Sequence, residues 1–128
     1  MKLLLDTHLL LWAAGSPERL SRRARELILD PSHDLVYSVA SVWEVAIKRA
    51  LGRADFSVDA RMLRRGLLDN GYAELSVLGT HALAVAHLPG LHRDPFDRML
   101  LAQAQAESMT LLTSDEAVAR YGEPALLV

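Results

Sequence analysis

The chain has 128 residues, of which 51% are hydrophobic and 23% are charged. This balance predicts one globular domain over residues 1–128 and excludes a disordered segment. The formal net charge of −2 excludes binding to nucleic acid through an overall basic field. The sequence contains no cysteine, which excludes disulfides and thiolate chemistry and is consistent with a cytoplasmic location. Asp6 and His8 interrupt the apolar N-terminus, and no apolar run has the length of a membrane span. We therefore expect neither a signal peptide nor a membrane segment.

Short apolar strands alternate with helices along the chain. In order, the pattern predicts a strand over 2–5, helices over 8–15 and 21–29, a strand over 34–38 and a helix over 41–51. It continues with helices over 59–68, 80–87 and 95–107, and with strands over 73–78, 109–115 and 124–128. Such alternation predicts an α/β fold, with a parallel sheet covered by helices on both faces. In these folds ligands bind outside the carboxyl ends of the strands, near the point where the strand order reverses.

Large apolar residues in two of the helices are interpreted as packing residues. Trp43, Ile47, Ala50 and Leu51 recur at helical spacing, which predicts one packed side of the helix that starts at residue 41. Met99 lies at core spacing in the helix over 95–107. We expect no role beyond packing for Trp43 and Met99.

Two acids come directly after predicted strands. Asp115 precedes "EAVARY" and fits a helix N-cap well. Asp6 is also a possible cap, but it is flanked by leucines in what should be the core, where an unpaired carboxylate is costly. Glu44 is a third candidate, one turn into its helix. It can either pair with Lys48 at i,i+4 or point toward the sheet, and periodicity does not choose between the two.

The stretch "HRDPFDR", residues 92–98, contains two acids with different predicted directions. Asp94 before Pro95 is a favourable N-cap with proline at the first helical position. Asp97 falls at the third position, where an acid can reach back to the cap. It also precedes Leu100, Leu101 and Ala104 on a stripe expected to face the protein. Asp97 is therefore the acid expected to point inward.

Convergence of Asp6, Glu44, Asp97 and Asp115 would create strong repulsion. Two such charges at 4 Å repel by roughly 4 kcal/mol at an effective dielectric constant of 20. A divalent metal would relieve this repulsion, and oxygen ligands favour Mg²⁺ or Mn²⁺. Such a centre can activate water for phosphodiester cleavage. The five histidines show no metal-binding spacing, and His8 is interpreted as a packing residue or a neighbour of the ligands.

Four segments of the chain together resemble the PIN-domain ribonucleases, especially the VapC-like toxins of toxin–antitoxin modules. They are "LLLDTHLLLW", "SVASVWEVAIKRALGR", "LPGLHRDPFDRMLLAQA" and "LLTSDEAVARYG", and the resemblance runs from Met1 to about Leu127. The resemblance implies a three-layer α/β/α sandwich with its acids at one end of a parallel sheet. It also implies endonucleolytic cleavage of RNA, often structured or transfer RNA. The implied partners are a cognate antitoxin, whose tail covers the acidic groove, and a second copy in a homodimer.

The resemblance also implies roles for individual residues. Asp6, Glu44, Asp97 and Asp115 match the family's metal-binding acids. Polar residues expected around them are Thr7, Ser41, Thr113 and Ser114. Asp94 is taken as accessory, and Glu116 is a possible substitute for its neighbour Asp115.

Two other functions remain open at this point. Asp6 could be the nucleophile of a phosphatase similar to the haloacid dehalogenases, but those proteins need a second acid two residues on, where this chain has His8. Alternatively the domain is a non-catalytic binding module whose acids serve as helix caps and salt-bridge partners.

Overall fold

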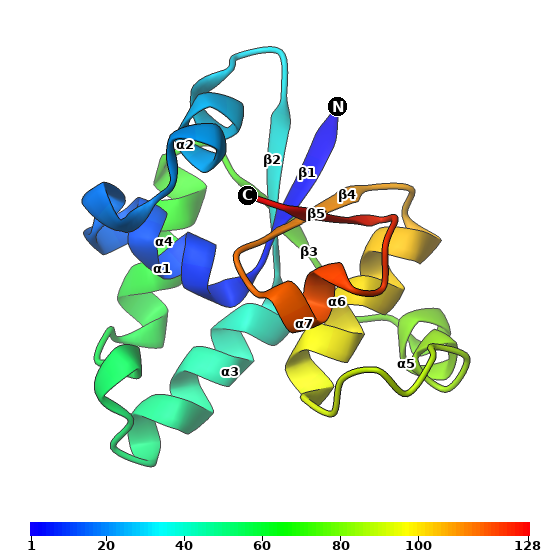
Figure 1. Cartoon of the computed structure of the whole chain (residues 1–128). Coiled ribbons are helices and arrows are strands. Elements are labelled where there is room, and N and C mark those ends of the chain that lie inside the picture. The colour runs from blue at the N-terminus through cyan, green and yellow to red at the C-terminus, as the bar shows by residue number, and fades with distance from the viewer.

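The computed structural model describes residues 1–128 and contains one sheet of five parallel strands (Figure 1). The strands are β1 (Lys2–Leu5), β2 (Asp34–Ser38), β3 (Ala73–Leu75), β4 (Thr110–Thr113) and β5 (Ala125–Leu127). Their order across the sheet is β3-β2-β1-β4-β5. Every neighbouring pair is parallel. Successive strands run outward from β1 to β3, and the chain then returns to the other side of β1 for β4. The strand order therefore reverses between β1 and β4.

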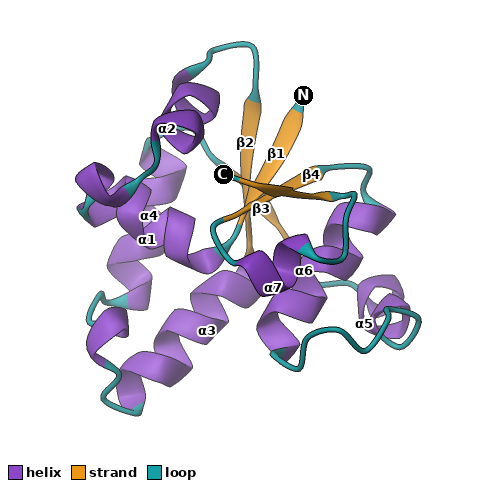
Figure 2. Cartoon of the chain, in the orientation of Figure 1, coloured by secondary structure: helices purple, strands orange, loops and turns teal.

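Seven α-helices connect the strands and lie on both sides of the sheet (Figure 2). They are α1 (Thr7–Gly15), α2 (Arg22–Leu29), α3 (Val39–Ala50), α4 (Ala60–Asp69), α5 (Gly79–Val85), α6 (Pro95–Ala106) and α7 (Glu116–Ala119). Two short 3₁₀ turns, η1 (Pro17–Arg19) and η2 (Ala54–Phe56), were not expected from the sequence. No helix combines the length and apolar character needed to cross a bilayer.

Two hydrophobic clusters hold the layers together, one on each face of the sheet. The alternation of side chains along β1 sends Leu3 and Leu5 into one cluster and Leu4 into the other. The first cluster includes apolar residues of α1, α2, α3 and α4. The second is built mainly on α6, through Leu100, Leu101 and neighbouring alanines. The predicted three-layer α/β/α architecture is therefore confirmed.

Element boundaries differ from the sequence prediction at several ends. The strand expected over 73–78 stops at Leu75, and α3 begins at Val39 rather than at Ser41. Ser38 explains the earlier start of α3, because its hydroxyl accepts a hydrogen bond from the Ala40 amide and caps the helix.

The predicted packed side of α3 is wrong. Trp43 is 61% exposed and Leu51 is 74% exposed, although Trp43 contacts the ring of Phe96 edge-to-face. The buried residues of α3 are smaller or polar: Ala40, Ser41, Glu44 and Val45. The helix turns this side inward because it faces the carboxyl end of the sheet, where polar groups find partners.

Candidate metal centre

Asp6 lies at the carboxyl end of β1 and caps α1, and its side chain is almost fully buried. One carboxylate oxygen accepts a hydrogen bond from the Leu9 amide at 2.9 Å. The other accepts hydrogen bonds from the Thr113 hydroxyl at 2.6 Å and the Ser114 amide at 3.3 Å. Burial raises the pKa of Asp6, and the hydrogen bonds from Thr113 and Leu9 oppose that effect. Because β4 is paired with β1, Thr113 and Ser114 come directly beside Asp6.

Asp97 lies in the first turn of α6 and points toward the other acids, as its spacing predicted. Burial raises its pKa to about 6. A hydrogen bond to His92 opposes this rise, whereas repulsion from Asp94, Glu44 and Asp6 adds to it. Asp94, Glu44 and Asp6 therefore lie close enough to repel the Asp97 carboxylate. The sequence allowed Asp97 to reach back and bond to the helix cap. Its side chain contacts His92 instead, with Oδ2 2.7 Å from His92 Nε2.

Three side chains converge on positions from which they could hold a metal ion. One ligand atom each from His92, Asp97 and Asp115 lies within 4.8 Å of the other two. Asp115 reaches this group from the end of β4, while its Oδ1 accepts a hydrogen bond from the Ala117 amide and caps α7. Glu116, the possible substitute for Asp115, is exposed and does not belong to the group.

The donor atoms of this group fit a divalent cation. Ligand atoms on one octahedral Mg²⁺ lie about 3 Å apart when adjacent and about 4.2 Å apart when opposite, so atoms within 4.8 Å of one another can surround one ion after the side chains move closer together. Two carboxylates and one imidazole suit Mn²⁺ and are compatible with Mg²⁺. The repulsion that raises the pKa of Asp97 is the repulsion that a bound cation would relieve.

His92 is a site residue that the sequence reading missed. It lies in the loop between α5 and α6, where no helical or strand periodicity predicts which side chains point inward. The one feature of the sequence that could have indicated His92 is its position two residues before the helix cap Asp94. His8 was interpreted as a packing residue or a neighbour of the ligands, and its ring contacts the rings of Trp12 and Phe56.

Arg98 holds the loop that carries His92. Its guanidinium donates hydrogen bonds to the carbonyl oxygens of Val85 at 3.0 Å and Pro89 at 2.9 Å. It also donates to the Tyr121 hydroxyl at 3.1 Å, and that hydroxyl accepts a hydrogen bond from the His92 amide at 3.0 Å. The second basic residue of "HRDPFDR" is therefore a positioning residue for the site.

Glu44 and its partners form the opposite side of the site. The Glu44 side chain is 4% exposed, and its Oε1 accepts a hydrogen bond from the Thr7 hydroxyl at 2.6 Å. The Ser41 hydroxyl lies 3.0 Å from that of Thr7. The other oxygen, Oε2, accepts a hydrogen bond from Lys48. Glu44 thus combines the two readings that the sequence left open, since it points inward and also pairs with Lys48.

Asp94 caps α6, as expected. Its Oδ1 accepts hydrogen bonds from the amides of Phe96 at 2.9 Å and Asp97 at 3.0 Å. Its Oδ2 lies 3.8 Å from Lys48 Nζ. Asp94 therefore orients the start of the helix that carries Asp97.

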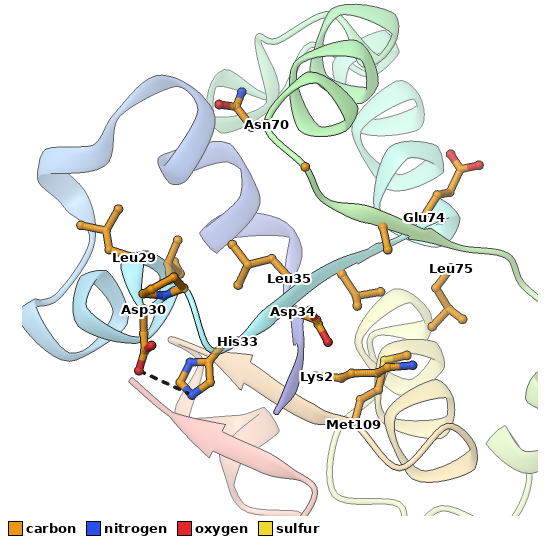
Figure 3. A pocket seen from close by; sticks show the side chains of 15 residues that line it. Lys2, Leu29, Asp30, His33, Asp34, Leu35, Asn70, Glu74, Leu75 and Met109 are labelled. Carbon is orange, nitrogen blue, oxygen red and sulfur yellow. Dashed lines mark ion pairs between the residues drawn. The ribbon is translucent and has the colours of Figure 1, made fainter.

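A second hollow, of about 530 Å³, lies at the opposite end of the sheet, beside the amino ends of β1, β2 and β3 (Figure 3). Two of its three acids, Asp30 and Glu74, have local partners. Asp30 accepts hydrogen bonds from Ser32 and lies 3.9 Å from His33, and Glu74 is held by Arg64 and Tyr37. None of these residues belongs to a potential metal-binding group. The carboxyl ends of β1 and β4 are therefore the better candidate for chemistry.

Comparison with known proteins identifies the family. The model of the PIN domain matches residues 3–124. No curated protein sequence matches the chain. Among solved structures, the fold is similar to VapBC2 from Rickettsia felis bound to a DNA fragment from their promoter, with TM-score 0.69 and 15% identity over all of this chain and 98% of the other. It is also similar to VapBC-1 from nontypeable Haemophilus influenzae, with TM-score 0.67 and 19% identity over all of this chain and 97% of the other. A third is FitAcB from Neisseria gonorrhoeae, with TM-score 0.66 and 18% identity over 98% and 96% of the two chains.

The family assignment agrees with the position of the site. The match extends from β1 to the residue before β5 and includes each acid at the carboxyl end of the sheet. At identities below 20%, the similarity to the three solved structures concerns the fold. The chain belongs to the PIN domain family.

Proposed function

We propose that the chain is the toxin of a toxin–antitoxin module and cleaves RNA internally in a reaction that needs Mg²⁺ or Mn²⁺. The observation that carries this proposal is the convergence of His92, Asp97 and Asp115 beside the buried Asp6, at the reversal of strand order in a PIN domain. The fold similarity to VapBC complexes supports the assignment to a toxin.

Each residue of the site has a defined task in this proposal. Asp97 and Asp115 hold the cation, and His92 supports Asp97 or binds the same ion. A divalent ion bound there supplies an activated water and positive charge next to the scissile phosphate. Asp6, fixed by Thr113 and by two amides, orients the attacking water through its carboxylate.

RNA is the proposed substrate although the net charge is negative. Two exposed arginines belong to segments that contribute to the site: Arg53, just before η2, lies over the ring of Phe56 and pairs with Asp55, and Arg93 follows His92 in the loop before α6. Local positive charge of this kind contributes to binding of the phosphate backbone of a single strand. The alternative of an aspartate phosphatase has less support, because His8 pairs with Asp55 at 3.3 Å and is not a second acid.

The proposed partners are a cognate antitoxin and a second copy of the chain. One apolar groove of about 490 Å³ runs between α3 and α6, and its lining includes the exposed Val39, Trp43 and Val77. An exposed apolar surface of this kind is typical of an interface. It supports association with another protein, and light scattering of the purified chain tests the homodimer.

Cleavage of RNA by the purified chain tests the proposed activity. We expect cleavage with Mg²⁺ or Mn²⁺, loss of cleavage with chelator, and loss in Asp97→Asn. Asp69→Asn is the matched control, since Asp69 is exposed at the end of α4, and it should cleave as the wild type does. Cleavage that persists in chelator and in Asp97→Asn would refute the mechanism. Absence of both cleavage and Mn²⁺ binding in calorimetry would instead support the non-catalytic binding module.

A further inference from the structure

Lys48 brings a positive charge into the acidic site. It lies on α3, its side chain is 16% exposed, and its ammonium group donates to Glu44 Oε2. The same group lies 3.8 Å from Asp94 Oδ2. Glu44 and Asp94 come from two helices, so this ion pair joins α3 to the start of α6. A charge in this position is partly shielded from solvent salt and is more effective than an exposed one.

Aromatic rings fix the position of the Lys48 ammonium. Its Nζ lies 4.8 Å from the centre of the Phe56 ring and 5.6 Å from that of Phe96. Contact with the faces of aromatic rings favours a cation at such distances. Four groups from three different segments therefore surround the ammonium, and none of them is a flexible surface side chain.

Besides Asp6, the carboxylates of the site fall into two sets. The first, Asp97 and Asp115, forms the potential metal-binding group with His92. The second, Glu44 and Asp94, lies outside this group and faces Lys48. Both oxygens of Glu44 already have a donor, one from Thr7 and one from Lys48. Both oxygens of Asp6 also accept hydrogen bonds, so a second divalent ion, at the separation of about 3.5–4 Å found in two-metal sites, would depend on Glu44 and Asp94.

We propose that Lys48 is a permanent second cation of the site. Its ammonium takes the position of a second divalent ion between Glu44 and Asp94, and it leaves the chain with a single metal site at Asp97, Asp115 and His92. This inference rests on the proposed metal-dependent function. It assigns Glu44 to the positioning of Lys48, because the ammonium group pairs with the buried Glu44 carboxylate.

Counting bound Mn²⁺ tests this inference. Calorimetry, with electron paramagnetic resonance of free Mn²⁺, should give one ion per wild-type chain at pH 7.5. Lys48→Met keeps an unbranched apolar stem against the rings of Phe56 and Phe96 and removes the charge, and we expect two ions per chain. The double variant Lys48→Met, Glu44→Gln should return to one ion, because the second ion then lacks its main ligand.

Lys2→Met is the matched control. The chain has two lysines, and Lys2 is exposed at the amino end of β1, at the opposite end of the sheet (Figure 3). Its substitution changes the net charge equally and should leave one ion bound. Lys48→Gln provides a second neutral variant if Lys48→Met does not fold, as judged by circular dichroism. The side-chain amide of the Lys48→Gln variant can still donate a hydrogen bond to Glu44.

The outcomes separate this inference from the proposed function. Two ions in the wild type, or one ion in both folded neutral variants, would overturn the inference while RNA cleavage by the wild type continues to support the function. If the wild type binds no Mn²⁺ and cleaves no RNA, the proposed function fails, and the inference fails with it.

Discussion

Replacement of Asp97 by asparagine should make the metal-free protein more stable at neutral pH. The folded protein raises the pKa of Asp97 from 3.8 to about 6, mainly through burial. The folded state therefore binds this proton more tightly than the unfolded state does. The resulting stability is fully present below pH 3.8 and is lost as the pH rises through about 6. At pH 7.5 the ionised Asp97 carboxylate therefore destabilises the folded protein.

The size of the effect follows from the difference between the two pKa values. Each pKa unit corresponds to about 1.4 kcal/mol, so a rise from 3.8 to about 6 corresponds to about 3 kcal/mol of lost stability. Asparagine does not titrate and retains an oxygen that can accept a hydrogen bond from His92. Asp97→Asn should then gain up to about 3 kcal/mol at pH 7.5, which moves the urea midpoint by roughly 1–2 M.

Urea unfolding in chelator, followed by circular dichroism at pH 4, 6 and 7.5, measures this difference. The wild type should lose stability across the series relative to Asp97→Asn, and Asp69→Asn should follow the wild type. Mn²⁺ at about 1,000 times its dissociation constant should reverse the order, because the wild type then gains about 4.1 kcal/mol and the variant, which lacks one carboxylate ligand, gains much less. A variant that is less stable than the wild type in chelator at pH 7.5 would refute the reasoning.

Two further predictions concern the residues around Asp97. Asp94→Asn should retain the helix cap and most of the activity, whereas Asp94→Ala should cost about 1 kcal/mol of stability in urea unfolding, since it leaves two amides without their acceptor. Equal losses of stability in both variants would contradict the capping role. Arg98→Met should cost about 2–3 kcal/mol and weaken Mn²⁺ binding, because it removes hydrogen bonds to Val85, Pro89 and Tyr121 that fix the loop of His92. Unchanged Mn²⁺ affinity in calorimetry would show that the loop is held without Arg98.

The sequence predicts the fold well because its signals are local. Short apolar runs followed by helical periodicity identify the strands and the helices, and this alternation implies a parallel sheet. The start of α6 could also be predicted from the sequence, because the hydrogen bonds of the cap at Asp94 and Pro95 span only two or three residues. The positions of Asp6 and Asp115 after strands placed them at one edge of the sheet, where the structure shows them.

The sequence did not predict correctly which side of α3 is buried. Helical spacing shows which residues share a side, but not which side faces the sheet. Large apolar residues favoured the side with Trp43 and Leu51, which is exposed. The side with Glu44 is buried instead, since Thr7 and Lys48 satisfy its carboxylate. This compensation depends on a contact between Thr7 of α1 and Glu44 of α3, which are 37 residues apart in the sequence.

By itself, the sequence determined the parallel α/β architecture, the cap of α6 at Asp94 and the acids that gather at one end of the sheet. Only the tertiary structure decided that His92 joins Asp97 and Asp115, that Arg98 holds their loop, and that Lys48 lies among the remaining carboxylates. The physical reason is the range of the interactions. Caps and periodicity act over a few residues, whereas the charges of the site are balanced by groups that only the packing of α1, α3 and α6 around the sheet brings together.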